Sequence, residues 1–194
     1  MRNKLFIGDS ITCKFNKQYK DVFDKYFKNG ALALGVSGDT FAGLHWRIRH
    51  GEVPNELNPA IWWIHIGTNN MKFTWECDYE KITLGIMHII EEIRSRKPDA
   101  IIVVNAILPR SDINSAAWDK IKKVNRELIL SVNSLNDDDV YFFDLYRDFY
   151  DKSLYNIKKG LHADTIHLSA NGYEIRAKRI VEWTKENLNI NLFY

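Results

Sequence analysis

Short apolar runs alternate with longer amphipathic segments along most of the chain. The apolar runs are too short for helices and are rich in β-branched or aromatic residues, as strands buried on both faces are. We predict five such strands, KLFIG (residues 4–8), ALALGV (31–36), AIWWIHIG (60–67), AIIVVNAIL (100–108) and VYFFDL (140–145).

The segments between these runs place apolar residues at steps of three and four, which is the spacing of a helix with one buried face. This spacing predicts helices over residues 11–28, 78–97, 115–134 and about 170–187. Parallel strands need such crossover helices, and right-handed crossovers cover both faces of the sheet. The pattern therefore predicts an α/β fold, a three-layer α/β/α sandwich around a five-stranded parallel sheet.

Composition favours one globular domain over residues 1–194. The chain is 45% hydrophobic and 27% charged, and no linker or low-complexity tract divides it. Its formal net charge is +2 without any Lys/Arg block, which argues against a nucleic-acid partner. The apolar runs are too short for a signal peptide or a membrane span, so we expect a cytoplasmic protein unless a leader has been removed.

Small and polar residues follow the predicted strands, at the edge of a parallel sheet where ligands bind. They are Gly8-Asp9-Ser10, GVSGDT (35–40), GTNN (67–70) and, near the C-terminus, HADTIHLSANGY (162–173). Each has an ordinary structural explanation by itself, such as a helix cap, a tight turn or a bond within a loop.

Taken together, these residues supply what ester cleavage needs: a nucleophile, a base, a group that orients the base, and donors for the oxyanion. Ser10 is the candidate nucleophile, and its backbone N–H at a helix N-terminus is a candidate oxyanion donor. His167 is the candidate base, with Asp164 three residues earlier to fix its tautomer. The Gly38 N–H and the Asn69 amide would complete the oxyanion hole.

Four of these blocks resemble, in order and position, those of the SGNH hydrolases, also called GDSL esterases and lipases. They are GDSI (8–11), SGDT (37–40), GTNN (67–70) and DTIHLS (164–169), and the resemblance spans residues 6–172. It implies a flavodoxin-like fold, and it implies the five roles that were just assigned from the chemistry.

One position departs from the commonest form of the third block. Many members have an aspartate where this chain has Asn70. The GTNN form resembles the branch that includes platelet-activating-factor acetylhydrolase-like and carbohydrate acetylesterase-like enzymes. We therefore expect an esterase that removes small acyl groups, acetyl above all, from a small-molecule or glycan ester, with Asp9, Asn70 and Arg110 as candidate substrate contacts.

Three alternatives remain at this stage. A lysophospholipase or thioesterase would use the same residues, and a non-catalytic glycan-binding module would use the same cleft. A metal cluster of His162, Asp164 and His167 is disfavoured, because no Cys/His partner at ligand spacing lies elsewhere. We expect no metal and no cofactor, and we expect His65, inside a strand pattern, to be a core histidine whose ring nitrogens are satisfied by hydrogen bonds.

Overall fold

The computed structural model describes residues 4–72, 78–110, 115–153 and 156–188. A five-stranded parallel sheet lies at its centre in the order β2-β1-β3-β4-β5. The strands are β1 (Lys4–Gly8), β2 (Ala31–Gly35), β3 (Ile61–His65), β4 (Ile101–Asn105) and β5 (Val140–Phe143). Every residue of the three central strands is buried, because helices cover both faces. The predicted sheet is confirmed, with strands that end up to three residues earlier.

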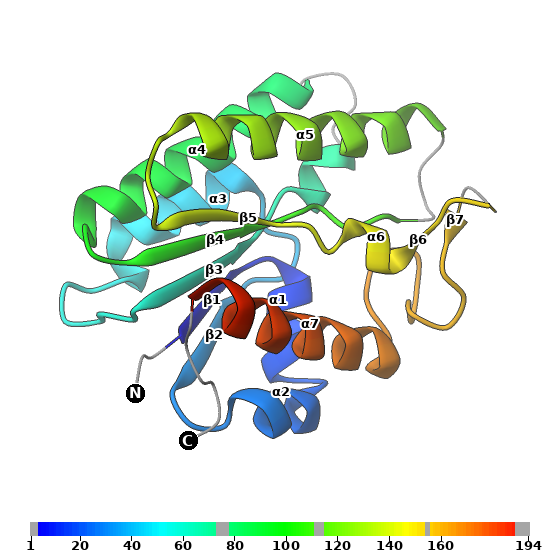
Figure 1. Cartoon of the computed structure of the whole chain (residues 1–194), viewed down its shortest axis with the longest axis horizontal. Coiled ribbons are helices and arrows are strands. Elements are labelled where there is room, and N and C mark those ends of the chain that lie inside the picture. Colours follow the sequence, from blue (N-terminus) through cyan, green and yellow to red (C-terminus); the bar gives the residue numbers. More distant parts are fainter. Residues whose placement is uncertain (1–3, 73–77, 111–114, 154–155, 189–194) are drawn as a thin grey trace.

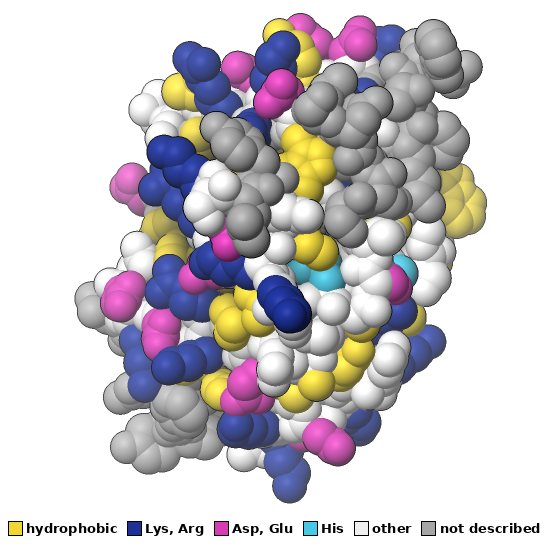
Figure 2. Space-filling model, turned by 90° about the vertical axis from the view of Figure 1, so that its right-hand side faces the viewer, with side chains coloured by type: hydrophobic (Ala, Val, Ile, Leu, Met, Phe, Trp, Pro, Cys, Tyr) yellow, Lys and Arg dark blue, Asp and Glu magenta, His cyan; other side chains and the backbone are white. Residues whose placement is uncertain are grey.

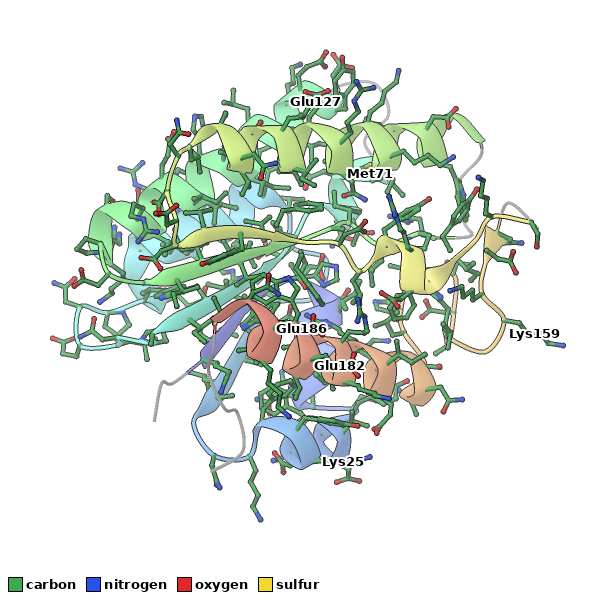
Figure 3. The ribbon with its side chains drawn as sticks, viewed as in Figure 1. Lys25, Met71, Glu127, Lys159, Glu182 and Glu186 are labelled. Carbon is green, nitrogen blue, oxygen red and sulfur yellow. The ribbon has the colours of Figure 1, made fainter. Side chains whose placement is uncertain are left out.

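Two helical layers enclose the sheet (Figure 1). One face carries α3 (Phe41–Arg47), α4 (Tyr79–Arg96) and α5 (Ser115–Ser134). The other face carries α1 (Ser10–Asn16), α2 (Lys20–Phe27) and α7 (Ala170–Leu188). Apolar side chains fill both interfaces and form two separate core clusters, and the sticks of Figure 3 occupy the space between sheet and helices. The predicted α/β/α layering is confirmed.

The single helix predicted over residues 11–28 is wrong. The chain forms α1 and α2 with a break between Asn16 and Lys20, where the Tyr19 N–H returns to the Lys14 carbonyl at 2.9 Å. The Tyr19 ring packs on Tyr173 of α7, with ring centroids 4.5 Å apart. The break turns α2 so that Phe23 also reaches the aromatic core. The break therefore coincides with a contact between Tyr19 and the C-terminal helix.

Several short elements were not predicted. They are α3, the π-turn η1 (Ile48–Glu52), the 3₁₀ turn η2 (Thr68–Lys72), α6 (Tyr146–Phe149) and the hairpin of β6 (Tyr150–Asp151) and β7 (Asn156–Ile157). Among the described helices, none is long and apolar enough to cross a membrane.

Candidate active site

The nucleophile turn is a tight junction between β1 and α1. A Cβ atom on Gly8 would lie 2.0 Å from the His65 carbonyl oxygen, so only glycine allows β1 and β3 to approach this closely. Asp9 is the N-cap of α1, and its Oδ1 accepts the Ile11 N–H at 2.9 Å. Ser10 is thereby the first residue of α1, at the carboxyl end of a central strand.

Ser10, His167 and Asp164 form one continuous chain of hydrogen bonds. His167 Nε2 lies 2.9 Å from Ser10 Oγ, and His167 Nδ1 lies 2.6 Å from Asp164 Oδ2. The face that holds the carboxyl ends of the strands is turned to the viewer in Figure 2, and histidine side chains reach the surface near its middle. The imidazole is thus placed to accept a proton from the serine hydroxyl, while the carboxylate holds the other ring nitrogen.

Asp164 is held as a carboxylate by its own loop. Partial burial by itself would raise its pKa, but the N–H groups of His167 and Ile166, together with the His167 ring, lower the pKa to about 2. Both N–H groups donate to Asp164 Oδ1, at 2.6 and 2.8 Å. The same backbone bonds fix the carboxylate in the orientation that meets the imidazole.

The predicted oxyanion donors lie on adjacent loops. Asn69 Nδ2 donates to the Asp39 carbonyl at 2.8 Å, next to Gly38 in sequence. This bond uses one of the two amide protons of Asn69 and holds its side chain against the loop that carries Gly38. Gly38 has a φ of +79°, a conformation that favours glycine, and a Cβ there would meet no atom within 4 Å. The Gly38 turn is therefore exposed, with free space beside it.

Arg47 on α3 joins these loops, and sequence reasoning missed it. Its Nε and Nη2 donate to Asp39 Oδ2 at 3.0 and 2.7 Å, and Nη2 also donates to the Gly8 carbonyl at 3.2 Å. Two donors of one guanidinium therefore converge on a single oxygen of Asp39, and such charge-assisted hydrogen bonds are short and strong. Arg47 thus ties the oxyanion loop to the nucleophile turn without belonging to any of the sequence blocks.

The three candidate substrate contacts are buried in this structure, and their role toward a substrate stays a prediction. Asp9 is 0% exposed, Arg110 1% and Asn70 5%. Asn70 Oδ1 accepts the Phe41 N–H at 3.2 Å, and Arg110 Nη1 donates to the Thr68 carbonyl at 2.6 Å. Through these hydrogen bonds Asn70 and Arg110 connect segments of the site to one another.

The histidines outside the triad have structural surroundings. His65 is 1% exposed, as predicted for a core residue, but among the described residues neither of its ring nitrogens has the hydrogen-bond partner that was expected. Burial, followed by the nearby Arg176 charge, lowers its pKa well below the usual value. His162 Nε2 lies 3.1 Å from the Pro109 carbonyl oxygen. Across the part of the chain that the structure describes, no three His, Cys, Asp or Glu side chains are grouped as metal ligands.

A serine, an imidazole and a carboxylate aligned at the carboxyl edge of a parallel α/β/α sheet make this a site of the serine-hydrolase type. The model of the GDSL-like lipase/acylhydrolase family matches residues 6–175. The chain therefore belongs to the GDSL-like lipase/acylhydrolase family.

Curated relatives include subunits of platelet-activating factor acetylhydrolase IB. The chain is 34% identical to the alpha2 subunit of Rattus norvegicus over 131 residues, which cover 68% of this chain and 55% of that protein. It is 31% identical to the alpha1 subunit of Bos taurus over 123 residues, which cover 62% and 50%. The chain spans about half the length of the curated relatives it matches.

Solved structures share the fold over nearly the whole chain. A GDSL-like lipase from Bacteroides thetaiotaomicron has a TM-score of 0.81 at 19% identity, covering 95% of this chain and 88% of that one. A family two carbohydrate esterase from Clostridium thermocellum in complex with cellohexaose has a TM-score of 0.74 at 21% identity, covering 97% and 65%. At these identities the likeness concerns the fold.

Proposed function

We propose that this protein is a serine esterase that removes small acyl groups, acetyl above all, from a carbohydrate or another polar alcohol. The observation that carries the proposal is the hydrogen-bonded chain from Asp164 through His167 to Ser10 Oγ. A binding module has no need of a base aligned on a hydroxyl. The names of the relatives, an acetylhydrolase and a carbohydrate esterase, support the choice of acyl group and alcohol.

In the acylation step, Ser10 Oγ attacks the ester carbonyl carbon as its proton moves to His167 Nε2. The negative charge that develops on the carbonyl oxygen is met by the Ser10 N–H, the Gly38 N–H and the Asn69 amide. Collapse of this tetrahedral intermediate breaks the bond to the alcohol oxygen, which takes the proton from the imidazolium. An acyl-serine remains.

In the deacylation step, the imidazole removes a proton from a water molecule that attacks the acyl-serine carbonyl. The same three donors stabilise the second oxyanion, and the proton returns to Ser10 Oγ as the carboxylic acid leaves. Asp164 remains ionised throughout and stabilises the imidazolium in both steps.

The test compares the wild type with Ser10→Ala on p-nitrophenyl acetate, butyrate and octanoate and on acetylated sugars. We expect the variant to be folded and inactive, since the hydroxyl is a small part of the turn. We expect acetyl esters to be cleaved faster than butyryl and much faster than octanoyl esters. A rate that rises with acyl length to eight carbons would favour a lipase-like enzyme, and full turnover by Ser10→Ala would remove Ser10 from the mechanism.

A further inference from the structure

The turn that carries Gly38 is exposed at its tip, so its position depends on how its ends are held. The Asp39 N–H donates to the Val36 carbonyl at 3.2 Å and closes a four-residue turn over 36–39. Gly38 has a φ of +79° and Ser37 before it has a negative φ, which makes this a type II turn. A Cβ atom on Gly38 would meet no described atom within 4 Å. Packing at the tip therefore does not hold the predicted oxyanion donor in place, and the two ends of the turn must do so.

Both ends of the Gly38 turn are anchored to one carbonyl of the nucleophile turn. The Gly8 carbonyl accepts the Val36 N–H at 3.0 Å and Arg47 Nη2 at 3.2 Å. The same Arg47 nitrogen and Nε donate to Asp39 Oδ2, at 2.7 and 3.0 Å. Val36 is thus anchored directly, and Asp39 is anchored through the guanidinium. Without Arg47, the Asp39 end would lose this link to the nucleophile turn.

The fold provides a specific seat for the Asp39 carboxylate. The side chains of Asp39 and Arg47 are 8% and 14% exposed. A Cβ atom on Gly43 of α3 would lie 2.1 Å from Asp39 Oδ1, so glycine at this position makes room for the carboxylate. Glu52 in η1 accepts Arg47 Nη1 and holds the guanidinium from its other side. A carboxylate with so little exposure is unfavourable without its charged partner, so we expect it to turn toward water when Arg47 is removed.

Asp39 also lies between two of the predicted oxyanion donors. Its carbonyl accepts Asn69 Nδ2 at 2.8 Å, and Gly38 directly precedes it in the chain. A shift of Asp39 would therefore move the Asn69 amide and the Gly38 peptide together. The position of one residue thus affects two donors that belong to different loops.

We propose that Arg47 is a positioning residue of the oxyanion hole, and that it acts by fixing Asp39. Asp39 in turn sets where the Gly38 N–H and the Asn69 amide lie relative to the nucleophile. The inference rests on the proposed function, in which these two groups stabilise the oxyanion. Such donors act at about 2.7–3.1 Å from the oxyanion, and a displacement of about 1 Å can cost about 10²-fold in rate. A residue that acts only through Asp39 can therefore have a large effect on turnover.

The experiment compares Arg47→Met, Gly43→Ala and the control Arg49→Met. Arg47→Met removes the guanidinium, whereas Gly43→Ala keeps it and places a methyl group where Asp39 Oδ1 lies. Arg49 is two positions further along the chain, and its side chain is 58% exposed. Hydrolysis of p-nitrophenyl acetate is measured at one pH on the plateau of the wild-type profile, so that protonation of the catalytic histidine does not contribute.

We expect kcat to fall about 10- to 100-fold in Arg47→Met and in Gly43→Ala, with KM within about two-fold, because the lost geometry matters in the transition state. Arg49→Met should behave as the wild type. Thermal unfolding is followed by circular dichroism, and the kinetics are measured where every variant is folded. Alanine is a better helix former than glycine, so lower turnover in folded Gly43→Ala is not a consequence of a weaker helix.

Two further measurements connect Arg47 to the oxyanion hole. Adding Arg47→Met to Asn69→Ala should cost less than the product of the two single losses, because both changes act on the same donors. In Arg47→Ala, millimolar guanidinium chloride should restore part of kcat, whereas ammonium chloride should not, because only the planar guanidinium can direct two N–H groups to one side of Asp39.

Unchanged kcat in folded Arg47→Met or Gly43→Ala would overturn the inference, as would a loss confined to KM. A fully multiplicative loss in the double variant with Asn69→Ala would also contradict it. If Arg47→Met does not fold, Gly43→Ala and Asp39→Ala decide, because both keep the guanidinium. Failure of the proposed function has a different signature, because Ser10→Ala would then still hydrolyse esters, or the wild type would neither cleave them nor react with a fluorophosphonate probe.

Discussion

Replacing Asp164 with asparagine should be the most damaging conservative change near the site, because it exchanges donor and acceptor in the hydrogen bond to His167 Nδ1. Asp164 Oδ1 accepts two backbone N–H groups and Oδ2 accepts His167 Nδ1. An asparagine must keep its oxygen toward the two N–H donors, so it presents its NH₂ to the imidazole. The ring then accepts at Nδ1 and carries its proton on Nε2. In this tautomer Nε2 cannot take the proton of Ser10.

The size of the effect follows from the loss of the base. A serine protease with the equivalent aspartate-to-asparagine change loses about 10⁴-fold in kcat with its geometry intact, which is about 5 kcal/mol of the barrier. We expect a similar loss here, because two backbone bonds of 2.6 and 2.8 Å hold the asparagine oxygen in place. KM should change little, since Asp164 is behind the imidazole and away from the ester.

Steady-state kinetics on p-nitrophenyl acetate, with burst-phase measurement of acylation, test this expectation. Asp164→Ala is the matched control, because it removes the carboxylate without forcing the wrong tautomer and should lose less of its acylation rate than Asp164→Asn. An Asp164→Asn enzyme within about 10-fold of the wild type would refute the assignment of Asp164 as the orienting acid.

Two further predictions concern the oxyanion hole and the stability of the protein at low pH. Asn69→Ala should lower kcat by about 10²–10³-fold with KM nearly unchanged, because the Asn69 amide acts on charge that develops in the transition state. A raised KM with unchanged kcat would instead make Asn69 a substrate-positioning residue. The Asp164 pKa of about 2 lies below the value of about 3.9 for an unfolded aspartate, so its stabilising contribution is present above pH 4 and lost toward pH 2. Urea unfolding should therefore show that the difference in free energy of unfolding between the wild type and Asp164→Asn becomes smaller from pH 4 to pH 2. A difference that stays constant would contradict the lowered pKa of Asp164.

Local periodicity was sufficient for the elements that are long and amphipathic. The predictions for α4 and α5 agree with the structure within one residue at each end, because their buried faces repeat at helical spacing. The helix α3 carried a signal that went unused. Thr40 caps it, and Phe41, Leu44 and Ile48 are spaced three and four apart. No helix is predicted over these residues, because seven residues are too few for the helical spacing to repeat.

The site likewise contains residues that the sequence predicts and residues that it does not. Ser10, Asp164 and His167 were identified from blocks that follow strands, and the structure brings these residues together. Arg47 gave no such signal, because its partners Asp39 and Gly8 become neighbours only through the fold. A sequence motif also gives no information on whether its side chains are buried, as those of Asp9 and Asn70 are.

The meeting of serine and histidine depends on the two ends of the fold. Ser10 and His167 are 157 positions apart, and no local loop connects them. They meet because α1 and α7 cover the same face of the sheet (Figure 1) and are joined by the Tyr173 bond to Ile11 and the Arg176 contact with Phe15. A rotation of α7 by one residue would turn the side chains of Tyr173 and Arg176 by about 100° about the helix axis. It would break both of their contacts with α1. The geometry of the base is therefore set by helix packing beneath the site as much as by the loop that carries it.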